Sequence, residues 1–106
     1  MYRIETFAED GGRCPFREWF DDLDPVTAAR VDRYIRRLEA GNFGAAKPLR
    51  EGVVELRLDF GPGYRVYFGL DGKTLVILLG GGDKRRQTAD IAHAVERWRR
   101  YKKGSV

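Results

Sequence analysis

The segment 53–68 constrains the fold of this 106-residue chain most, because its hydrophobic side chains recur at every second position. Apolar residues occupy positions 54, 56, 58 and 60, with polar residues between them, which is the pattern of a β-strand with one buried face. A turn at Gly61-Pro62-Gly63 interrupts the alternation, and a second alternating run starts at Tyr64. The segment therefore predicts two antiparallel strands joined by a glycine-rich turn.

Two further strands are predicted from the rest of the chain. Asp71-Gly72 is typical of a hairpin turn, and the aliphatic run 75–79 after it predicts an interior strand that completes a meander. The glycines at 80–82 then predict a loosely packed strand end. A weaker alternation over residues 2–7 predicts a first strand at the N-terminus.

Apolar residues spaced three and four positions apart predict three helices. The first begins at Pro15, the second runs from Asp24-Pro25 to a stop at Gly41, and the third covers about Thr88 to Tyr101. The resulting order is β-α-α-β-β-β-α in a single domain over residues 1–106. We therefore expect a small α+β fold in which an antiparallel meander packs against helices and one sheet face stays partly open.

The distribution of charge indicates the kind of partner. The chain carries a net charge of +4, but residues 1–24 carry −4 and the remainder carries +8. A basic body favours binding of a polyanion by one face. The alternative is an evenly solvated surface without such a partner.

Cysteine content and hydropathy disfavour several classes of protein. The single cysteine, Cys14, excludes an intrachain disulfide, and one histidine with one cysteine does not match a structural zinc site. The longest aliphatic run, 75–79, is too short to span a bilayer, and the N-terminus lacks an apolar leader. We expect a cytoplasmic protein without metal, cofactor or membrane partner.

Alternation also sorts side chains between the two sheet faces. If positions 54, 56 and 58 face the core, Arg57 lies on the opposite face, and the same reasoning places Arg65 and Tyr67 there. We expect all three on one open surface, with Lys84 and Arg85 overhanging it beyond the glycines. Arginine binds phosphate oxygens as a planar fork, and tyrosine stacks on a base or donates its hydroxyl. The alternative is that the arginines are bridged to carboxylates of the neighbouring strand positions.

Proton transfer has no obvious carrier in this sequence. His93, the only side chain with an ordinary pKa near neutrality, is expected on the solvent face of the last helix. The other candidates all require a shifted pKa. They are Glu55, Asp83, Asp90, Tyr67 and the lysines. Such a site works mainly by positioning and charge stabilisation.

A second basic feature is a ridge of arginines on the second predicted helix, opposite its apolar stripe. The ridge consists of Arg30, Arg33 and Arg37. We expect it to contact RNA or the ribosome together with Arg85 and Arg86, which follow the last strand. The alternative is a solvated face whose charges pair with Asp32 and Glu39.

Several of these segments together resemble a known family. The segments are Val54-Glu55-Leu56-Arg57, Gly61-Pro62-Gly63-Tyr64-Arg65-Val66-Tyr67-Phe68 and Leu78-Leu79-Gly80-Gly81-Gly82-Asp83-Lys84, followed by Gln87 and Asp90-Ile91. They are similar to HigB-like addiction-module killer proteins of the RelE/ParE superfamily of type II toxins. The resemblance covers nearly the whole chain, including the helices around Trp19 and Trp98.

This resemblance implies a RelE-like fold, together with an activity and partners. It implies an endoribonuclease (an mRNA interferase) that cleaves messenger RNA on the translating ribosome, by attack of a ribose 2′-hydroxyl on the adjacent phosphate. It implies neutralisation by a cognate antitoxin, a helix-turn-helix protein similar to HigA. The toxin would then meet operator DNA only through that antitoxin.

The resemblance also assigns roles to residues. Arg65 matches the strand arginine that stabilises the phosphorane charge, Arg57 lies near the place of a basic residue of the preceding strand, and Lys84 matches the cation after the last strand. The catalytic tyrosine of RelE-type toxins has no counterpart, because this chain has residues 87–90 at that place. The candidates for the general base are Tyr67, Glu55 and Asp90.

Two other functions remain open at this point. A ParE-like inhibitor of DNA gyrase has no nuclease chemistry, and an inactive toxin remnant binds nucleic acid without a lethal target. Convergence of Arg57, Arg65 and Lys84 favours the nuclease, because a gyrase inhibitor needs no set of cations facing a phosphate.

Overall fold

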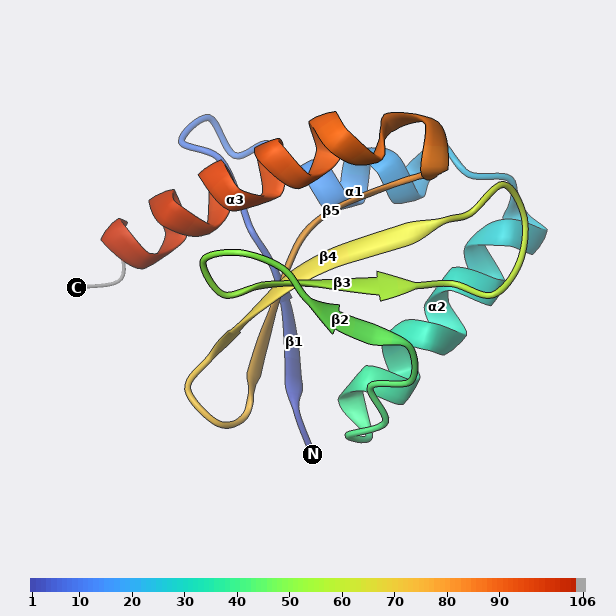
Figure 1. The fold of residues 1–106 in the computed structure, drawn as a ribbon, viewed down its shortest axis with the longest axis horizontal. Coiled ribbons are helices and arrows are strands. Elements are labelled where there is room, and N and C mark those ends of the chain that lie inside the picture. The colour runs from blue at the N-terminus through green and yellow to red at the C-terminus, as the bar shows by residue number, and fades with distance from the viewer. Residues whose placement is uncertain (105–106) are drawn as a thin grey trace.

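The structure, a computed structural model, describes residues 1–104. The chain folds into one five-stranded sheet with helices on both faces (Figure 1). The strands are β1 (Arg3–Thr6), β2 (Ala46–Pro48), β3 (Val53–Arg57), β4 (Arg65–Asp71) and β5 (Leu75–Gly82). Their order in the sheet is β1-β5-β4-β3-β2, and β1 runs parallel to β5 while the other neighbours are antiparallel. The helices are α1 (Pro15–Asp21), α2 (Pro25–Glu39), the 3-10 helix η1 (Lys84–Arg86) and α3 (Gln87–Gly104).

The α+β class and the predicted order of elements are confirmed, with one strand added. β2 was not expected, because its three residues include a proline and are too few to show an alternation. It pairs antiparallel with β3 and forms the edge of the sheet.

Helix α2 begins and ends where the sequence predicts. Asp24 caps its start by accepting hydrogen bonds from the Thr27 backbone N–H (3.1 Å) and hydroxyl (2.6 Å). At the other end, Gly41 adopts a φ of 89°, and the N–H of Asn42 bonds the carbonyl of Arg37. The Gly41 N–H bonds the carbonyl of Leu38. Together the two hydrogen bonds form a Schellman motif, which needs a residue in the left-handed conformation and therefore favours glycine.

The sheet separates two hydrophobic cores. The core beneath α1 and α2 contains Phe16, Val31, Ile35, Leu38, Leu56, Leu58, Val66, Phe68, Val76 and Leu78. The core beneath α3 contains Phe7, Val53, Tyr67, Ile77, Leu79, Ala94, Val95 and Trp98. The prediction of a partly open sheet face is therefore wrong over β4 and β5, because burying large apolar side chains there is worth about 1.5–3 kcal/mol each.

The three glycines that end β5 pack tightly instead of forming a loose strand end. A Cβ at position 81 would collide with the Trp19 ring of α1, and a Cβ at position 80 would lie 2.8 Å from Nη1 of Arg97. At position 82 the carboxylate of Asp90 occupies the space that a Cβ would need. These residues must lack side chains because both neighbouring helices contact the strand backbone directly.

Candidate active site

The pairing of β3 with β4 places the two strand arginines on one face. Arg57 lies directly opposite Arg65, and Glu55 lies opposite Tyr67. The intervening apolar residues Leu56 and Val66 belong to the core on the α2 side. The prediction that Arg57, Arg65 and Tyr67 share a sheet face is thus confirmed, and this face is the one that α3 covers.

Arg65 is not on an open surface as predicted, since only 7% of the residue is exposed. Its Nη1 donates a hydrogen bond to the Gly63 carbonyl at 2.6 Å, and its Nε lies 3.7 Å from a carboxylate oxygen of Glu55. Nε itself has no hydrogen-bond partner in the described part of the chain. Lys84 of η1 meets this guanidinium at Gly63, and Glu55 beside it is bonded by Gln87 at the start of α3.

Tyr67 is also buried, with 1% of the residue exposed, so the prediction that it stacks on a base is wrong for this conformation. Its hydroxyl has no hydrogen-bond partner among residues 1–104. Burial raises the pKa of the hydroxyl above its usual value, and the charges of Glu55 and Asp90 raise it further. Tyr67 is therefore a protonated core residue and an unsuitable general base.

A buried polar cluster lies under the first turn of α3. The Gln87 side chain donates a hydrogen bond of 2.8 Å to the same Glu55 oxygen that lies near Arg65. Glu55 is 5% exposed, so its charge is stabilised by these two partners instead of water. The alternative that Glu55 bridges the strand arginine is confirmed for Arg65. Gln87 is among the residues that carry the family resemblance, but the sequence did not indicate its contact with Glu55, because the two residues are 32 positions apart.

Lys84 and Arg57 are the exposed cations of this region. A Cβ on Gly63, whose φ is 78°, would lie 3.0 Å from both the Lys84 Cβ and the Arg65 Nη1, so the three residues meet at this glycine. The Lys84 N–H also donates to the Pro62 carbonyl at 3.3 Å. No carboxylate pairs with Arg57 or Lys84 within residues 1–104. Both charges are therefore available to a ligand.

Asp90 has the electrostatic properties expected of a proton acceptor. Its Oδ2 is buried against Gly82 and has no hydrogen-bond partner in the described residues. Burial raises the pKa of this carboxyl above the usual aspartate value, while Arg86, His93 and Arg97 oppose the shift. A carboxylate with a raised pKa is a better base near neutrality.

A groove of about 750 Å³ extends from Asp90 between α1 and α3, with the β5 glycines on its floor. His93 is exposed on α3 as predicted, yet it also lines this groove together with Arg86. Arg85 pairs with Asp83 at 3.2 Å. Arg97 donates a 2.9 Å hydrogen bond to the Leu79 carbonyl, a contact that the sequence did not indicate.

The arginine ridge on α2 is exposed and is stacked on aromatic rings. The guanidinium of Arg30 lies 4.0 Å from the Phe60 ring centre, and that of Arg37 lies 4.7 Å from the Tyr34 ring centre. The predicted pairing with Asp32 and Glu39 involves Arg36 instead. Across the part of the chain that the structure covers, Arg30, Arg33 and Arg37 have no carboxylate partner. The Phe60 and Tyr34 contacts were not predicted.

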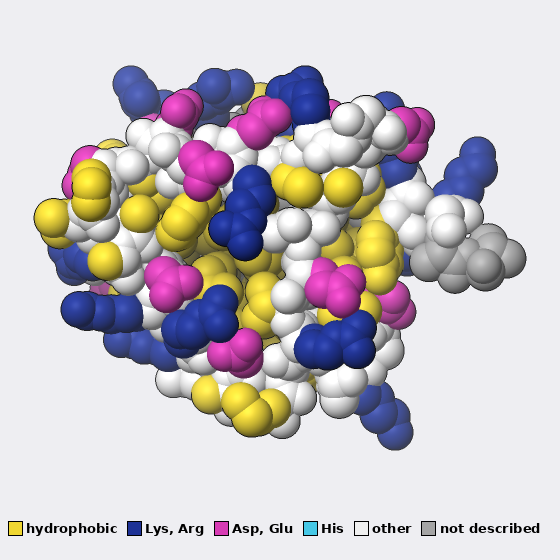
Figure 2. All heavy atoms as spheres, turned by 180° about the vertical axis from the view of Figure 1, so that it is seen from behind, with side chains coloured by type: hydrophobic (Ala, Val, Ile, Leu, Met, Phe, Trp, Pro, Cys, Tyr) yellow, Lys and Arg dark blue, Asp and Glu magenta, His cyan; other side chains and the backbone are white. Residues whose placement is uncertain are grey.

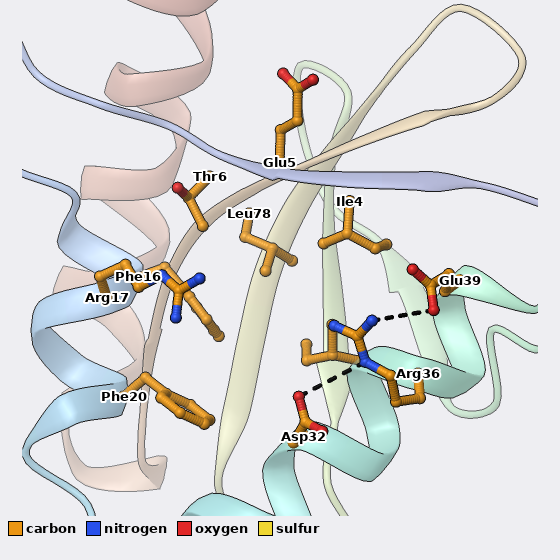
Figure 3. A pocket seen from close by; sticks show the side chains of 11 residues that line it. Ile4, Glu5, Thr6, Phe16, Arg17, Phe20, Asp32, Arg36, Glu39 and Leu78 are labelled. Atoms are coloured by element: carbon orange, nitrogen blue, oxygen red, sulfur yellow. Dashed lines mark hydrogen bonds and ion pairs between the residues drawn. The ribbon is translucent and has the colours of Figure 1, made fainter.

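Another cavity lies on the opposite side of the sheet from α3. Viewed from behind, the molecule has a hollow with hydrophobic side chains at its base and charged side chains at its rim (Figure 2). A cavity of about 460 Å³ between β1, α1 and α2 is lined by Phe16, Phe20 and Leu78 (Figure 3). Arg36 at its edge is bound by two carboxylates of the same helix (Figure 3). This cavity is separate from the candidate site, because its lining includes none of Arg57, Arg65, Lys84 and Asp90.

Two further properties bear on the kind of site. Within residues 1–104, no three His, Cys, Asp or Glu side chains are grouped so that they could hold a metal ion. None of the helices in the same range combines the length and hydrophobicity needed to cross a bilayer.

Comparison with known proteins identifies the family. Residues 18–102 match the family described as phage derived protein Gp49-like (DUF891). An uncharacterized protein of Haemophilus influenzae is 46% identical over 80 residues, which are 74% of this chain and 81% of that protein. A free double arginine-to-alanine mutant of the E. coli toxin RelE superposes with a TM-score of 0.64 at 19% identity, covering 91% of this chain and 96% of RelE. The chain therefore belongs to the Gp49-like family of phage-derived proteins and has the fold of RelE.

Proposed function

We propose that this protein is the toxin of a type II toxin–antitoxin pair, HigB-like in kind, and that it cleaves messenger RNA on the ribosome in the cytoplasm. Membership of the Gp49-like family and the fold of RelE support this assignment. The observation that carries the chemistry is a pair of exposed cations, Arg57 and Lys84, on either side of the buried Arg65. Neither cation has a carboxylate partner within residues 1–104.

In the proposed reaction, the ribose 2′-hydroxyl attacks the adjacent phosphate and the 5′-oxygen leaves. Arg57 and Lys84 bind the phosphate oxygens and stabilise the added charge of the phosphorane. Asp90 accepts the proton of the 2′-hydroxyl, and the 5′-oxygen takes a proton from water as it leaves. The products are a 2′,3′-cyclic phosphate and a 5′-hydroxyl.

Arg65 and Tyr67 have different roles in this proposal from those that the sequence suggested. Arg65 holds the Gly63 carbonyl and thereby positions the turn against which Lys84 packs, so we assign it as a positioning residue. Tyr67 stays in the core. The ridge of Arg30, Arg33 and Arg37, with Arg85 and Arg86, binds ribosomal or messenger RNA.

The test is induced expression followed by mapping of RNA ends. Wild type should stop protein synthesis promptly and produce RNA fragments with 2′,3′-cyclic phosphates. Arg57→Ala with Lys84→Ala should reduce cleavage by at least about 100-fold, as expected when transition-state charge loses its stabilisation. Arg36→Ala, an exposed and ion-paired arginine of α2, serves as the control and should cleave normally.

A ParE-like gyrase inhibitor is the second candidate, because Arg65 and Tyr67 are buried and fewer groups are left to face a phosphate. Under that function, induction should damage DNA while messages stay intact, and the double substitution should change nothing. In either case we propose that a cognate helix-turn-helix antitoxin binds the protein and connects it to operator DNA.

A further inference from the structure

Strand β5 is longer than the strand that pairs with its outer edge. The last paired residue of β1 is Thr6, which lies opposite Leu78, and the next N–H, from Phe7, bonds the Leu78 carbonyl. The next carbonyl along β5, that of Leu79, accepts a hydrogen bond from the Arg97 side chain. Beyond that point, no strand within residues 1–104 pairs with the outer edge of Gly80–Gly82.

This unpaired edge forms the floor of the 750 Å³ groove, and the end of β5 runs between α1 and α3 (Figure 1). Trp19 covers one face of the strand at Gly81, and Asp90 and Arg97 cover the other face at Gly82 and Gly80. A ligand can therefore reach the strand only in the plane of the sheet. Because the glycines have no side chains, a second backbone can approach this edge closely.

The charges of the groove disfavour nucleic acid as its occupant. Its lining includes five carboxylates and four guanidinium groups, which does not suit a polyanion. The charges are also sorted between the walls. On the α1 side and the loop before it, the lining has three carboxylates against one guanidinium: Glu9, Glu18 and Asp22 against Arg13. On the side of η1 and α3 it has three guanidinium groups against two carboxylates: Arg85, Arg86 and Arg97 against Asp83 and Asp90. The first wall is therefore net acidic and the second net basic.

We propose that an extended segment of a partner protein pairs with Gly80–Gly82 and takes the place in the sheet that β1 leaves after Thr6. Directly paired residues point to the same side of a sheet. The partner residue opposite Gly81 therefore points to the acidic α1 wall, and its two neighbours point to the basic α3 wall. The segment that fits has a basic residue between two acidic residues, and its backbone supplies the hydrogen bonds.

This surface deepens the proposed function, on which it rests for the identity of the partner. An antitoxin segment bound there would lie beside Asp90 and Arg86, two residues of the same groove. It would block access to both without displacing α3. The partner segment is thus a direct inhibitor of the site.

The test uses the full-length protein labelled with ¹⁵N and an eight-residue peptide of alternating Glu and Lys. A peptide with the four Glu and the four Lys in separate blocks is its control. We expect the alternating peptide to bind at least about tenfold more tightly, to shift the amide signals of Gly80–Gly82, and to slow hydrogen exchange at Gly81. Arg86→Glu should weaken binding about tenfold, whereas Arg33→Glu, the same charge change on α2, should leave it unchanged.

Three results would overturn the inference: shifts confined to other surfaces, equal binding of the block peptide, or stronger shifts of the same glycines by octauridine RNA. None of these measurements involves RNA cleavage. Peptide binding by a protein that cleaves no RNA would refute the proposed function alone. Cleavage without binding of the peptide at this edge would refute only the present inference.

Discussion

At position 81, the Trp19 ring occupies the space that any side chain would need. Gly81→Ala should therefore lower the free energy of unfolding by about 1–3 kcal/mol, because the tryptophan or the strand must shift. Urea unfolding measures this change. Gly11→Ala is the matched control, since nothing lies within 4 Å of its Cβ position, and it should be close to neutral. Adding Trp19→Leu to Gly81→Ala should recover part of the loss.

Arg65 on β4 is paired with Arg57 on β3, but Arg65 is buried and Arg57 is exposed. Their substitution by alanine should therefore lower the free energy of unfolding by different amounts. Arg65→Ala leaves the buried Glu55 carboxylate without its cation and should cost about 3–5 kcal/mol. Arg57→Ala removes an exposed side chain and should change stability by less than about 0.5 kcal/mol. Equal, small effects in chemical denaturation would contradict the burial of Arg65.

The carboxyls of Asp90 and Asp83 should respond to pH in opposite directions. Burial raises the pKa of Asp90, so its stabilising contribution is full below the ordinary value of 3.8 and is lost as pH rises through the folded-state pKa. Asp90→Asn should therefore make the protein more stable than wild type at pH 7, and the difference should shrink toward pH 4. Thermal unfolding across this range measures it.

Asp83 is the control for this pH series. Hydrogen bonds from the Arg85 side chain and backbone lower its pKa, so its contribution is present above 3.8 and is lost as pH falls through the folded-state pKa. Asp83→Asn should accordingly be less stable than wild type at pH 7. The same sign of change for Asp83→Asn and Asp90→Asn would contradict the environments described for the two groups.

At the scale of single elements, α2 combines a buried apolar stripe with a ridge of arginines that have no carboxylate partner in the described part of the chain. Reversing Arg30 and Arg37 to Glu should weaken binding to ribosomes and reduce the slope of log affinity against log salt by about 2, since each arginine neutralises about one phosphate. Filter binding at several salt concentrations measures the slope. Reversing Arg99 and Arg100 on α3, which already pair with Glu51 and Glu96, should leave the slope unchanged.

The helices and central strands were predictable because their signals are local. The α2 cap at Asp24, its stop at Gly41 and the alternation along β3 depend on neighbouring residues in the sequence. The face shared by Arg57 and Arg65 followed from that alternation together with the turn between the strands. Local periodicity therefore accounts for most of the fold.

The errors concern contacts between distant elements. Alternation shows that Arg65 and Tyr67 lie opposite the first core, but it does not show that α3 forms a second core over them. The shift of register in β5, where Tyr67 pairs with Gly80 and Phe68 with Leu78, also has no local signal. It turns both Leu79 and Gly80 toward α3 and so determines which glycine meets which helix.

At the scale of the whole molecule, the first strand lies in the sheet next to the last one. Arg3–Thr6 pair with Leu75–Leu78, so about 70 residues separate the two sides of this contact. During synthesis from the N-terminus, β1 must wait for β5 before it has a partner, because β1 pairs with no other strand of the sheet. While β5 and α3 are still in the exit tunnel, the nascent chain lacks both the finished sheet and the helix that packs on it. The site can therefore form only after β5 and α3 have both emerged from the tunnel.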